Sequence, residues 1–254
     1  MARPATPTFS VIGLLLILVA AVLAVPASAP AQGAKPIFDG RLTLKPGKLS
    51  SPEETLMKDT VLPAARQAWH ERERDAECDA GFKPSALDIA AGSFTKPKSD
   101  QRAILYTYCT FGHNMALNGI AVIENGRVVT HIVYEGGNDR AIGALPDIND
   151  NGLSEILIAT GGTNQGITWG TISIIEIAGP EIVQFGQTGT LADDSGIHEK
   201  TGKIKANRIS VKAGKTPVFY REIFVDNGSG GWRKPGLLAP ISLEEDKVEY
   251  ELLK

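Results

Sequence analysis

The sequence lacks the short motifs that identify common classes of enzyme. It contains no Gly-x-Ser-x-Gly, no His-Glu-x-x-His and no glycine-rich phosphate loop. It also lacks clusters of basic residues, with 26 Lys and Arg against 29 Asp and Glu and a formal net charge of −3. A mildly acidic chain of this kind argues against nucleic acid as a partner. We therefore expect a protein that is not an enzyme and does not bind nucleic acid.

Long apolar runs are also scarce, and the one that stands out covers residues 11–25. Arg3 is the only charge before Lys35, and small residues at 27–31 follow the run. This order is typical of a secretory signal peptide, and fifteen residues fall short of the ~20 that span a bilayer. We expect cleavage after Ala31, a periplasmic or secreted protein, and no stable membrane insertion afterwards. An uncleaved membrane anchor is the alternative.

Cysteine is rare, with only Cys78 and Cys109 in the whole sequence. In an exported protein two cysteines are expected to pair. The bridge would close a loop that the chain-entropy treatment values at roughly 3–4 kcal/mol. Two separate buried thiols are the alternative, and no basic or histidine neighbour flanks either cysteine to make it a catalytic nucleophile.

A helical segment is predicted at residues 51–77. Ser51 can cap its first turn, Pro52 fits the first helical position, and Glu54 can return the capping-box hydrogen bond. Apolar residues then recur on one face of the helix. Pro63 should kink this helix or divide it in two, because proline has no backbone N–H to donate.

From residue 78 onward, short apolar runs separated by turn residues predict an all-β domain. Asn125 and Gly126 stand between two such runs and predict a type I′ hairpin. The strands are expected at 87–91, 103–109, 120–123, 128–134, 156–159, 172–177, 182–185, 204–211 and 218–225. The expected organisation is a signal peptide at 1–31, an extended arm at 32–50, the helical segment at 51–77 and a β domain at 78–254.

Oxygen-bearing side chains alternate along the segment 147–155. They are Asp147, Asn149, Asn151 and Glu155, at positions one, three, five and nine. Gly152 at position six permits a sharp turn, so one short loop can wrap its oxygens around a hard cation such as Ca²⁺. Ile158 stands at position twelve, where an EF-hand requires a bidentate glutamate, so the EF-hand is excluded.

A related segment lies 54 residues earlier, where residues 92–101 align with residues 146–155. Both segments precede an apolar strand, and a period near 50 residues is typical of propeller blades. The positions that match the oxygen-bearing ones are Ser93, Thr95, Pro97 and Gln101. Because none of these is a carboxylate, we expect no cation in the earlier copy.

The later loop resembles the calcium loops of FG-GAP (integrin-alpha-like, VCBS-type) repeats. The family pattern is Asp-x-Asp/Asn-x-Asp-Gly-x-x-Asp followed by apolar residues. The resemblance implies that the ligands of a structural Ca²⁺ are the side chains of Asp147, Asn149, Asn151 and Glu155 and the carbonyl of Leu153. Asn151 and Glu155 both stand where the family has Asp. An ordinary Asx turn without an ion is the alternative.

The resemblance also implies blade-like sheets, but the chain has room for three blades at most at a ~50-residue period. A closed propeller needs at least four. The expected fold is therefore mainly β, with propeller-blade-like or sandwich antiparallel sheets and an N-terminal helical segment that covers an edge.

Trp169 and Trp232 stand beside glycine-rich loops, where exposed aromatic rings would indicate a ligand surface and buried rings would indicate packing. We expect an exported, calcium-stabilised β-repeat module of the cell envelope, either structural or binding an extracellular or periplasmic protein or carbohydrate. The alternative is a metal-assisted extracellular hydrolase. That reading requires His113 or His198 to lie beside Asp147.

Overall fold

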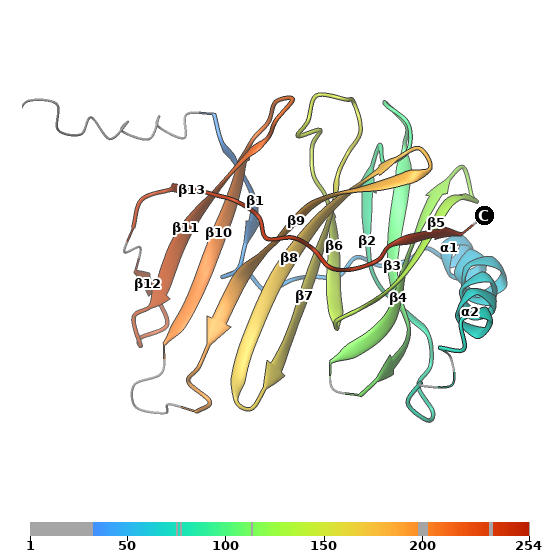
Figure 1. Cartoon of the computed structure of the whole chain (residues 1–254), viewed down its shortest axis with the longest axis horizontal. Coiled ribbons are helices and arrows are strands. Elements are labelled where there is room, and N and C mark those ends of the chain that lie inside the picture. Colours follow the sequence, from blue (N-terminus) through green and yellow to red (C-terminus); the bar gives the residue numbers. More distant parts are fainter. Residues whose placement is uncertain are drawn as a thin grey trace, which may run out of the picture.

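The computed structural model describes residues 33–74, 76, 78–112, 114–197, 203–233 and 236–253. Within these ranges the chain is mainly β, with antiparallel sheets and one helical segment near the N-terminus, which confirms the predicted fold class (Figure 1). No helix in the described part of the chain has both the length and the apolar character needed to cross a bilayer. The predicted signal peptide at 1–31 lies outside the described residues.

The first sheet has five antiparallel strands in the order β14-β5-β4-β3-β2. Their bounds are β2 Ser85–Gly92, β3 Gln101–Phe111, β4 Met115–Glu124, β5 Arg127–Gly136 and β14 Glu251–Leu253. Asn125 and Gly126 connect β4 to β5 with φ angles of 50° and 73°, as the predicted type I′ turn requires.

The second sheet has nine strands, with β12-β11-β10-β9-β8-β7-β6 as its main path. Its bounds are β6 Asp139–Ala144, β7 Ile156–Asn164, β8 Ile167–Ala178, β9 Glu181–Asp193, β10 Ile204–Lys212, β11 Val218–Asp226, β12 Trp232–Arg233, β13 Ala239–Ile241 and β1 Lys35–Asp39. Strand β1 forms within the expected extended arm and pairs with β10. Strands β9 and β10 pair only between 191–193 and 204–206, so two groups of strands meet there through a short ladder.

Two consecutive four-stranded antiparallel units, β2–β5 and β6–β9, follow one another along the chain. Ser85 begins the first unit and Asp139 the second, 54 residues later, and β5 and β9 begin with the same offset. The segments that align in the sequence are the connections that follow the first strand of each unit. The weak internal repeat therefore corresponds to two structural units of the same order.

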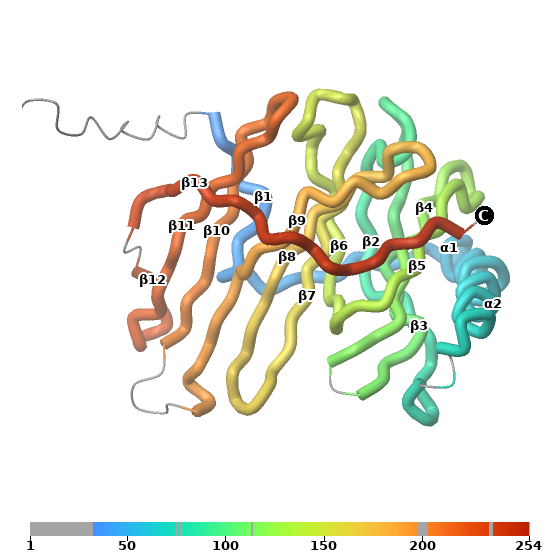
Figure 2. The backbone as a smooth tube through the Cα atoms, viewed as in Figure 1, coloured from blue at the N-terminus to red at the C-terminus, as the bar shows by residue number. Residues whose placement is uncertain are grey.

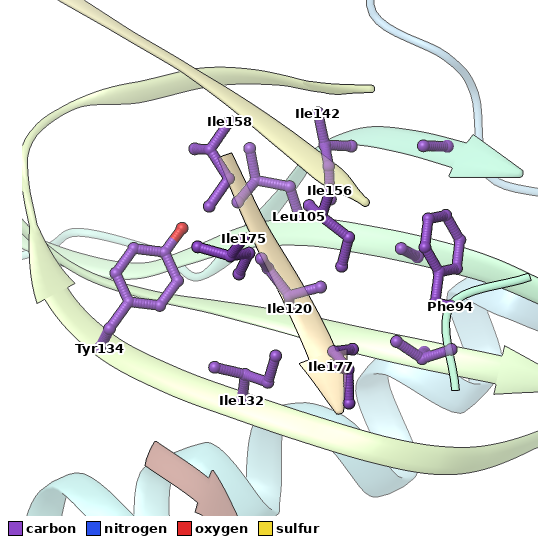
Figure 3. Packing of buried hydrophobic residues seen from close by; sticks show 13 residues of the cluster. Phe94, Leu105, Ile120, Ile132, Tyr134, Ile142, Ile156, Ile158, Ile175 and Ile177 are labelled. Atoms are coloured by element: carbon purple, nitrogen blue, oxygen red, sulfur yellow. The ribbon is translucent and has the colours of Figure 1, made fainter. Parts of the chain in front are cut away.

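Three buried clusters hold these layers together. The first lies between the two sheets, where Leu105, Ile120 and Ile132 meet Ile158 and Ile175, as Figure 3 shows. The second packs the helical segment onto the other face of the first sheet, so the helix covers a face and the predicted covering of an edge is wrong. The third packs the other face of β7 and β8 against β10, β11 and the arm. Burial of apolar side chains in these layers, at about 25 cal/mol per Å², is the main force that joins them.

The helical segment runs without a break through α1 (Ser51–Leu56), the π-helical turn η1 (Met57–Val61) and α2 (Leu62–Glu71). The predicted capping residues are one position too late, because Ser50 is the N-cap and Glu53 accepts its backbone N–H at 2.7 Å. Glu53 also forms a salt bridge with Arg102 of β3, which fixes the position at which the helix begins. Pro63 lies in the first turn of α2, directly after η1. The wider turn of η1 stands between α1 and α2 within the continuous helix.

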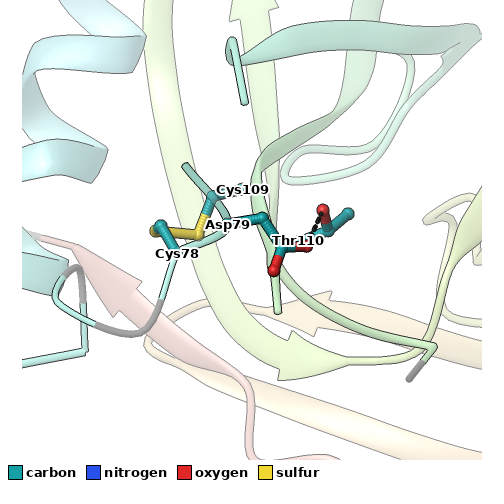
Figure 4. The surroundings of a disulfide bond; sticks show 4 residues. All are labelled: Cys78, Asp79, Cys109 and Thr110. Atoms are coloured by element: carbon teal, nitrogen blue, oxygen red, sulfur yellow. Dashed lines mark hydrogen bonds between the residues drawn. A yellow bond between two sulfur atoms is a disulfide. The ribbon is translucent and has the colours of Figure 1, made fainter. Parts of the chain in front are cut away.

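Cys78 and Cys109 form the predicted disulfide, with their Cα atoms 5.6 Å apart (Figure 4). Next to the bridge, the Asp79 backbone N–H donates to the Thr110 carbonyl at 2.8 Å, and the Thr110 hydroxyl donates to the Asp79 carboxylate at 3.0 Å. The bridge therefore attaches the connection after the helix to the end of β3.

The segment 244–253 runs across both sheets, and we call it the C-terminal strap (Figures 1 and 2). Glu244 and Gln187 of β9 exchange two backbone hydrogen bonds of 2.8 Å. Further along, Gln184 donates to the Val248 carbonyl, and β14 then pairs with β5. The strap thus joins the outer strand of each four-stranded unit.

Candidate functional site

The loop predicted to bind Ca²⁺ connects β6 to β7, and Asp147 organises its backbone. One carboxylate oxygen of Asp147 accepts the N–H groups of Asn149 and Asn151 at 3.2 and 3.1 Å, and the other accepts that of Gly152 at 2.6 Å. This is the hydrogen bonding of an Asx turn. An ionised carboxylate has about four acceptor sites, so these three contacts leave about one lone pair for a cation.

Glu155 closes the loop from inside the protein. Its side chain is fully buried, and its carboxylate accepts the Ile148 N–H at 3.1 Å. Burial, with smaller contributions from the negative charges of Glu176 and Asp147, raises the pKa of Glu155 to about 7, against the opposing effect of the backbone hydrogen bonds. Among the described residues no positive charge lowers this pKa, so the charged form of Glu155 is disfavoured.

Glu176 belongs to the same site, although it lies outside the sequence motif. It is buried on β8, and its carboxylate accepts the side-chain amides of Asn149 and Asn151 at 3.0 and 2.8 Å. A sequence signal does exist, because Glu176 is the only charged residue in the apolar run 172–178. A buried charge in such a run requires polar partners, and the loop provides them.

One oxygen in this loop has no donor. Asn149 Oδ1 is buried and unpaired, whereas the amide nitrogen of the same side chain contacts Glu176. A buried acceptor without a partner costs about 1–3 kcal/mol. Carboxylate, amide and carbonyl oxygens are the ligands that Ca²⁺ takes, so the donor set fits this cation.

The carboxylates alone do not make a ready-formed metal site. Among the described residues, no group of three or more His, Cys, Asp and Glu side chains is placed to hold a metal ion. A cation here would therefore depend on asparagine and backbone oxygens as well. Leu153 is held in the loop by its own N–H, which donates to Asn151 Oδ1 at 2.9 Å.

The loop between β2 and β3 shows how the same connection closes with a neutral residue at the position of Glu155. Gln101 occupies the place of Glu155, and its side-chain oxygen accepts the N–H groups of Phe94 and Thr95, both at 2.9 Å. The two loops also touch, because the Ser154 N–H donates to the Ser93 carbonyl at 2.9 Å. A neutral side chain can therefore close this type of loop.

The two tryptophans singled out in the sequence do not share a surface. Trp169 on β8 is half-buried and lines a cavity between the sheets, whereas Trp232 on β12 is exposed. Three strands separate β8 from β12 in the sheet, a distance of about 19 Å at ~4.8 Å per strand. Any ligand contact of Trp169 is therefore independent of Trp232.

The histidines of the hydrolase reading, His113 and His198, both lie outside the described residues. The structure therefore offers no placement of either beside Asp147. Comparisons of the chain with protein-family models, with curated proteins and with solved structures gave no match.

Proposed function

We propose that this chain is an exported β-repeat module of the cell envelope, stabilised by Ca²⁺ in the loop 147–155. The observation that carries the proposal is the unpaired buried oxygen of Asn149 beside Glu176, together with the buried Glu155. A divalent cation would use that oxygen and offset the negative charge. The resemblance of the loop to FG-GAP calcium loops supports the same conclusion.

Export is supported by the Cys78–Cys109 bridge, since disulfides persist mainly in oxidising compartments. It is also supported by the signal-peptide pattern at 11–31. The mature protein should therefore begin near Gln32, which an intact-mass measurement of protein from the periplasm or medium tests. A mature chain that retains residues 11–25 would contradict export with cleavage.

The proposed role is binding or structural, and the partner would be an extracellular or periplasmic protein or carbohydrate. Two stacked sheets that are joined by the strap provide a rigid support for the loops between strands, and the disulfide fastens the connection after the helix to the first sheet. Ca²⁺ would act on this support by stabilising the connection between β6 and β7. It would take no part in bond cleavage.

The test compares melting curves in calcium and in EDTA for the wild type and for Glu155→Gln. At ~10 mM Ca²⁺, about 100 times a dissociation constant of ~10⁻⁴ M, binding to the folded state adds roughly 2.7 kcal/mol. Glu155→Gln retains an acceptor for Ile148, as Gln101 does in the earlier loop, but removes the charge. We expect the wild type to melt at a higher temperature in calcium and the variant to lose most of that response.

Glu181→Gln is the matched control, because Glu181 carries the same charge on the exposed start of β9. Its calcium response should equal that of the wild type. Asp147→Ala discriminates less well, because it removes three backbone hydrogen bonds whether or not an ion is present. Equal calcium responses in the wild type and Glu155→Gln, or no response in either, would refute a calcium site in this loop.

A further inference from the structure

A second polar region lies at the other end of the strands that follow the calcium loop. A cavity of about 210 Å³ opens there between the sheets and is bounded on its outer side by the C-terminal strap. Ser173 is the cavity residue nearest to Glu176 along β8, and it lies three residues away, or about 10 Å at ~3.3 Å per residue. The cavity and the loop are therefore separate sites.

The cavity lies at one end of the core between the sheets. Figure 3 shows Tyr134 and Phe94 at opposite ends of this buried cluster. Phe94 belongs to the loop that touches the calcium loop, whereas Tyr134 lines the cavity. Trp169 and Gln187 in the cavity wall are only half-buried. The cavity is therefore open to solvent on one side.

Two buried carboxylates face this cavity from different parts of the chain. Asp139 begins β6 and Asp246 lies on the strap, and each is 8% exposed. The hydrogen-bond donors of Asp139 are the hydroxyls of Tyr134 and Thr160, both at 2.6 Å, and the amide of Asn118 at 3.1 Å. All of these donors are neutral.

Asp246 has a similar environment but weaker hydrogen bonds. It accepts the Val248 N–H and the Tyr250 hydroxyl, both at 3.2 Å. Among the described residues that line the cavity, none is a lysine or an arginine. Burial raises the pKa of Asp139 to about 6, with a smaller contribution from the charge of Asp246, so the Asp139 carboxylate is mostly ionised at pH 7.4.

Aromatic rings complete the lining. Tyr134 and Tyr250 pack with ring centroids 4.8 Å apart and planes tilted by 51°, and Trp169 contributes a third ring from β8. Aromatic faces attract cations, most strongly where the cation is removed from water. Buried carboxylates repel anions and bind cations by direct charge attraction. The two features favour the same kind of ligand.

We propose that the cavity between Asp139, Asp246, Tyr134, Tyr250 and Trp169 binds a small organic cation that carries an alkylammonium group. The ammonium group donates hydrogen bonds to the two carboxylates, and its alkyl chain packs against the rings. Asp246 comes from the strap, so the strap is part of the binding site as well as a link between the sheets. This site works without Ca²⁺, because it lies at the far end of β7 and β8.

The experiment titrates the full mature chain with n-butylammonium chloride and follows binding by isothermal titration and ligand-observed NMR. 1-Butanol and butyrate serve as neutral and anionic ligands of the same chain length. We expect saturable 1:1 binding of n-butylammonium and no saturable binding of the other two. The titration is repeated in EDTA, so failure of the calcium site and failure of this site give different results.

Asp246→Asn should weaken n-butylammonium binding by about tenfold or more, which corresponds to ~1.4 kcal/mol. Glu245→Gln is the matched control, because Glu245 is an exposed acid on the same strap, and it should leave binding unchanged. A melting curve shows whether each variant is folded. Tyr250→Phe, which keeps the ring and loses the hydroxyl, should bind, whereas Tyr250→Leu should bind more weakly.

Equal binding of 1-butanol and n-butylammonium would overturn the proposal, as would unchanged binding in folded Asp246→Asn. A neutral sugar, methyl β-glucoside, tests the competing possibility that the polar and aromatic lining recognises carbohydrate. Saturable binding of this glycoside that depends on Trp169 but not on the charge of Asp246 would show that the ligand is a carbohydrate and not an organic cation.

Discussion

The buried carboxylate of Glu155 should make the stability of this protein fall as the pH rises, when calcium is absent. Its pKa is about 7 in the folded protein, against ~4.3 for an unperturbed glutamate. Between these values the folded state binds more protons than the unfolded state, so the free energy of unfolding decreases with increasing pH. Over the full window the loss is roughly 4 kcal/mol, of which roughly 3 kcal/mol falls above about pH 5.

Two other buried groups titrate in the same range. Asp139, with a pKa of about 6, adds a loss of the same sign. His131, which accepts or donates a 2.5 Å hydrogen bond with Tyr106, has its pKa lowered by burial to about 4. The contribution of His131 to the free energy of unfolding therefore falls as the pH drops from ~6.5 towards 4. This trend is opposite to those of Glu155 and Asp139. The contribution of Glu155 is isolated only by comparison with Glu155→Gln.

The assay is urea unfolding in EDTA, at pH values from about 5 to about 8, for the wild type and for Glu155→Gln. The variant retains the acceptor for Ile148, and its side chain cannot ionise. Its free energy of unfolding should therefore rise relative to that of the wild type by up to roughly 3 kcal/mol as the pH rises. Added calcium should remove most of this difference at high pH, because it stabilises the ionised form of Glu155 in the wild type. A difference between the two proteins that stays constant over this range would refute the argument.

Three further predictions concern the fold. The double variant Cys78→Ser/Cys109→Ser should lose about 3–4 kcal/mol in the free energy of unfolding, measured in urea against the oxidised wild type; a loss below ~1 kcal/mol would contradict a stabilising bridge. Gly186→Ala should lower the melting temperature, because Gly186 has a φ of 115° and its added Cβ would lie 2.5 Å from the Glu244 carbonyl oxygen; protection of the strap in hydrogen exchange should fall with it, and unchanged exchange would contradict this. Phe94→Ala, at a fully buried position in the cluster between the sheets, should cost about 3–5 kcal/mol, and a urea midpoint near that of the wild type would show that the core refills the space.

Much of the fold could be predicted from local sequence patterns. Strands β3, β5, β8, β10 and β11 contain apolar or alternating runs, and the turn at 125–126 has the residues that its backbone requires. The disulfide followed from the presence of only two cysteines. These features depend on short-range chemistry, which the sequence displays directly.

Other features arise from contacts between distant segments. Strand β6 contains Asp139, Arg140 and Gly143 and lacks a clear strand pattern, yet it pairs with β7. Asp88 of β2 supports it by accepting the Ile142 N–H at 2.9 Å. Tertiary pairing can override weak β propensity in this way. The strand β1 within the arm has a similar origin, because its only ladder is with β10.

The candidate site was only partly visible in the sequence. The motif identified Asp147 and the residues at alternating positions, because all of them lie in one loop. Glu176 joins the loop from β8, and only the pairing of β7 with β8 places it there. The cavity is harder to predict still, since Asp139 and Asp246 are more than one hundred residues apart and meet through the strap.

The pairing of β14 with β5 also affects the time at which the protein can fold. Glu251 pairs with Val133, and Lys35 of β1 pairs with Val211, so both ladders close very long loops. Such contacts form slowly, because the loop entropy is lost before the contacts contribute. A chain emerging from the ribosome must expose every strand from β1 to β10 before the ladder of β1 can close, and β14 before the other ladder can. Hairpins between consecutive strands need no such wait, so β2 to β5 can pair before the arm and the strap are fixed.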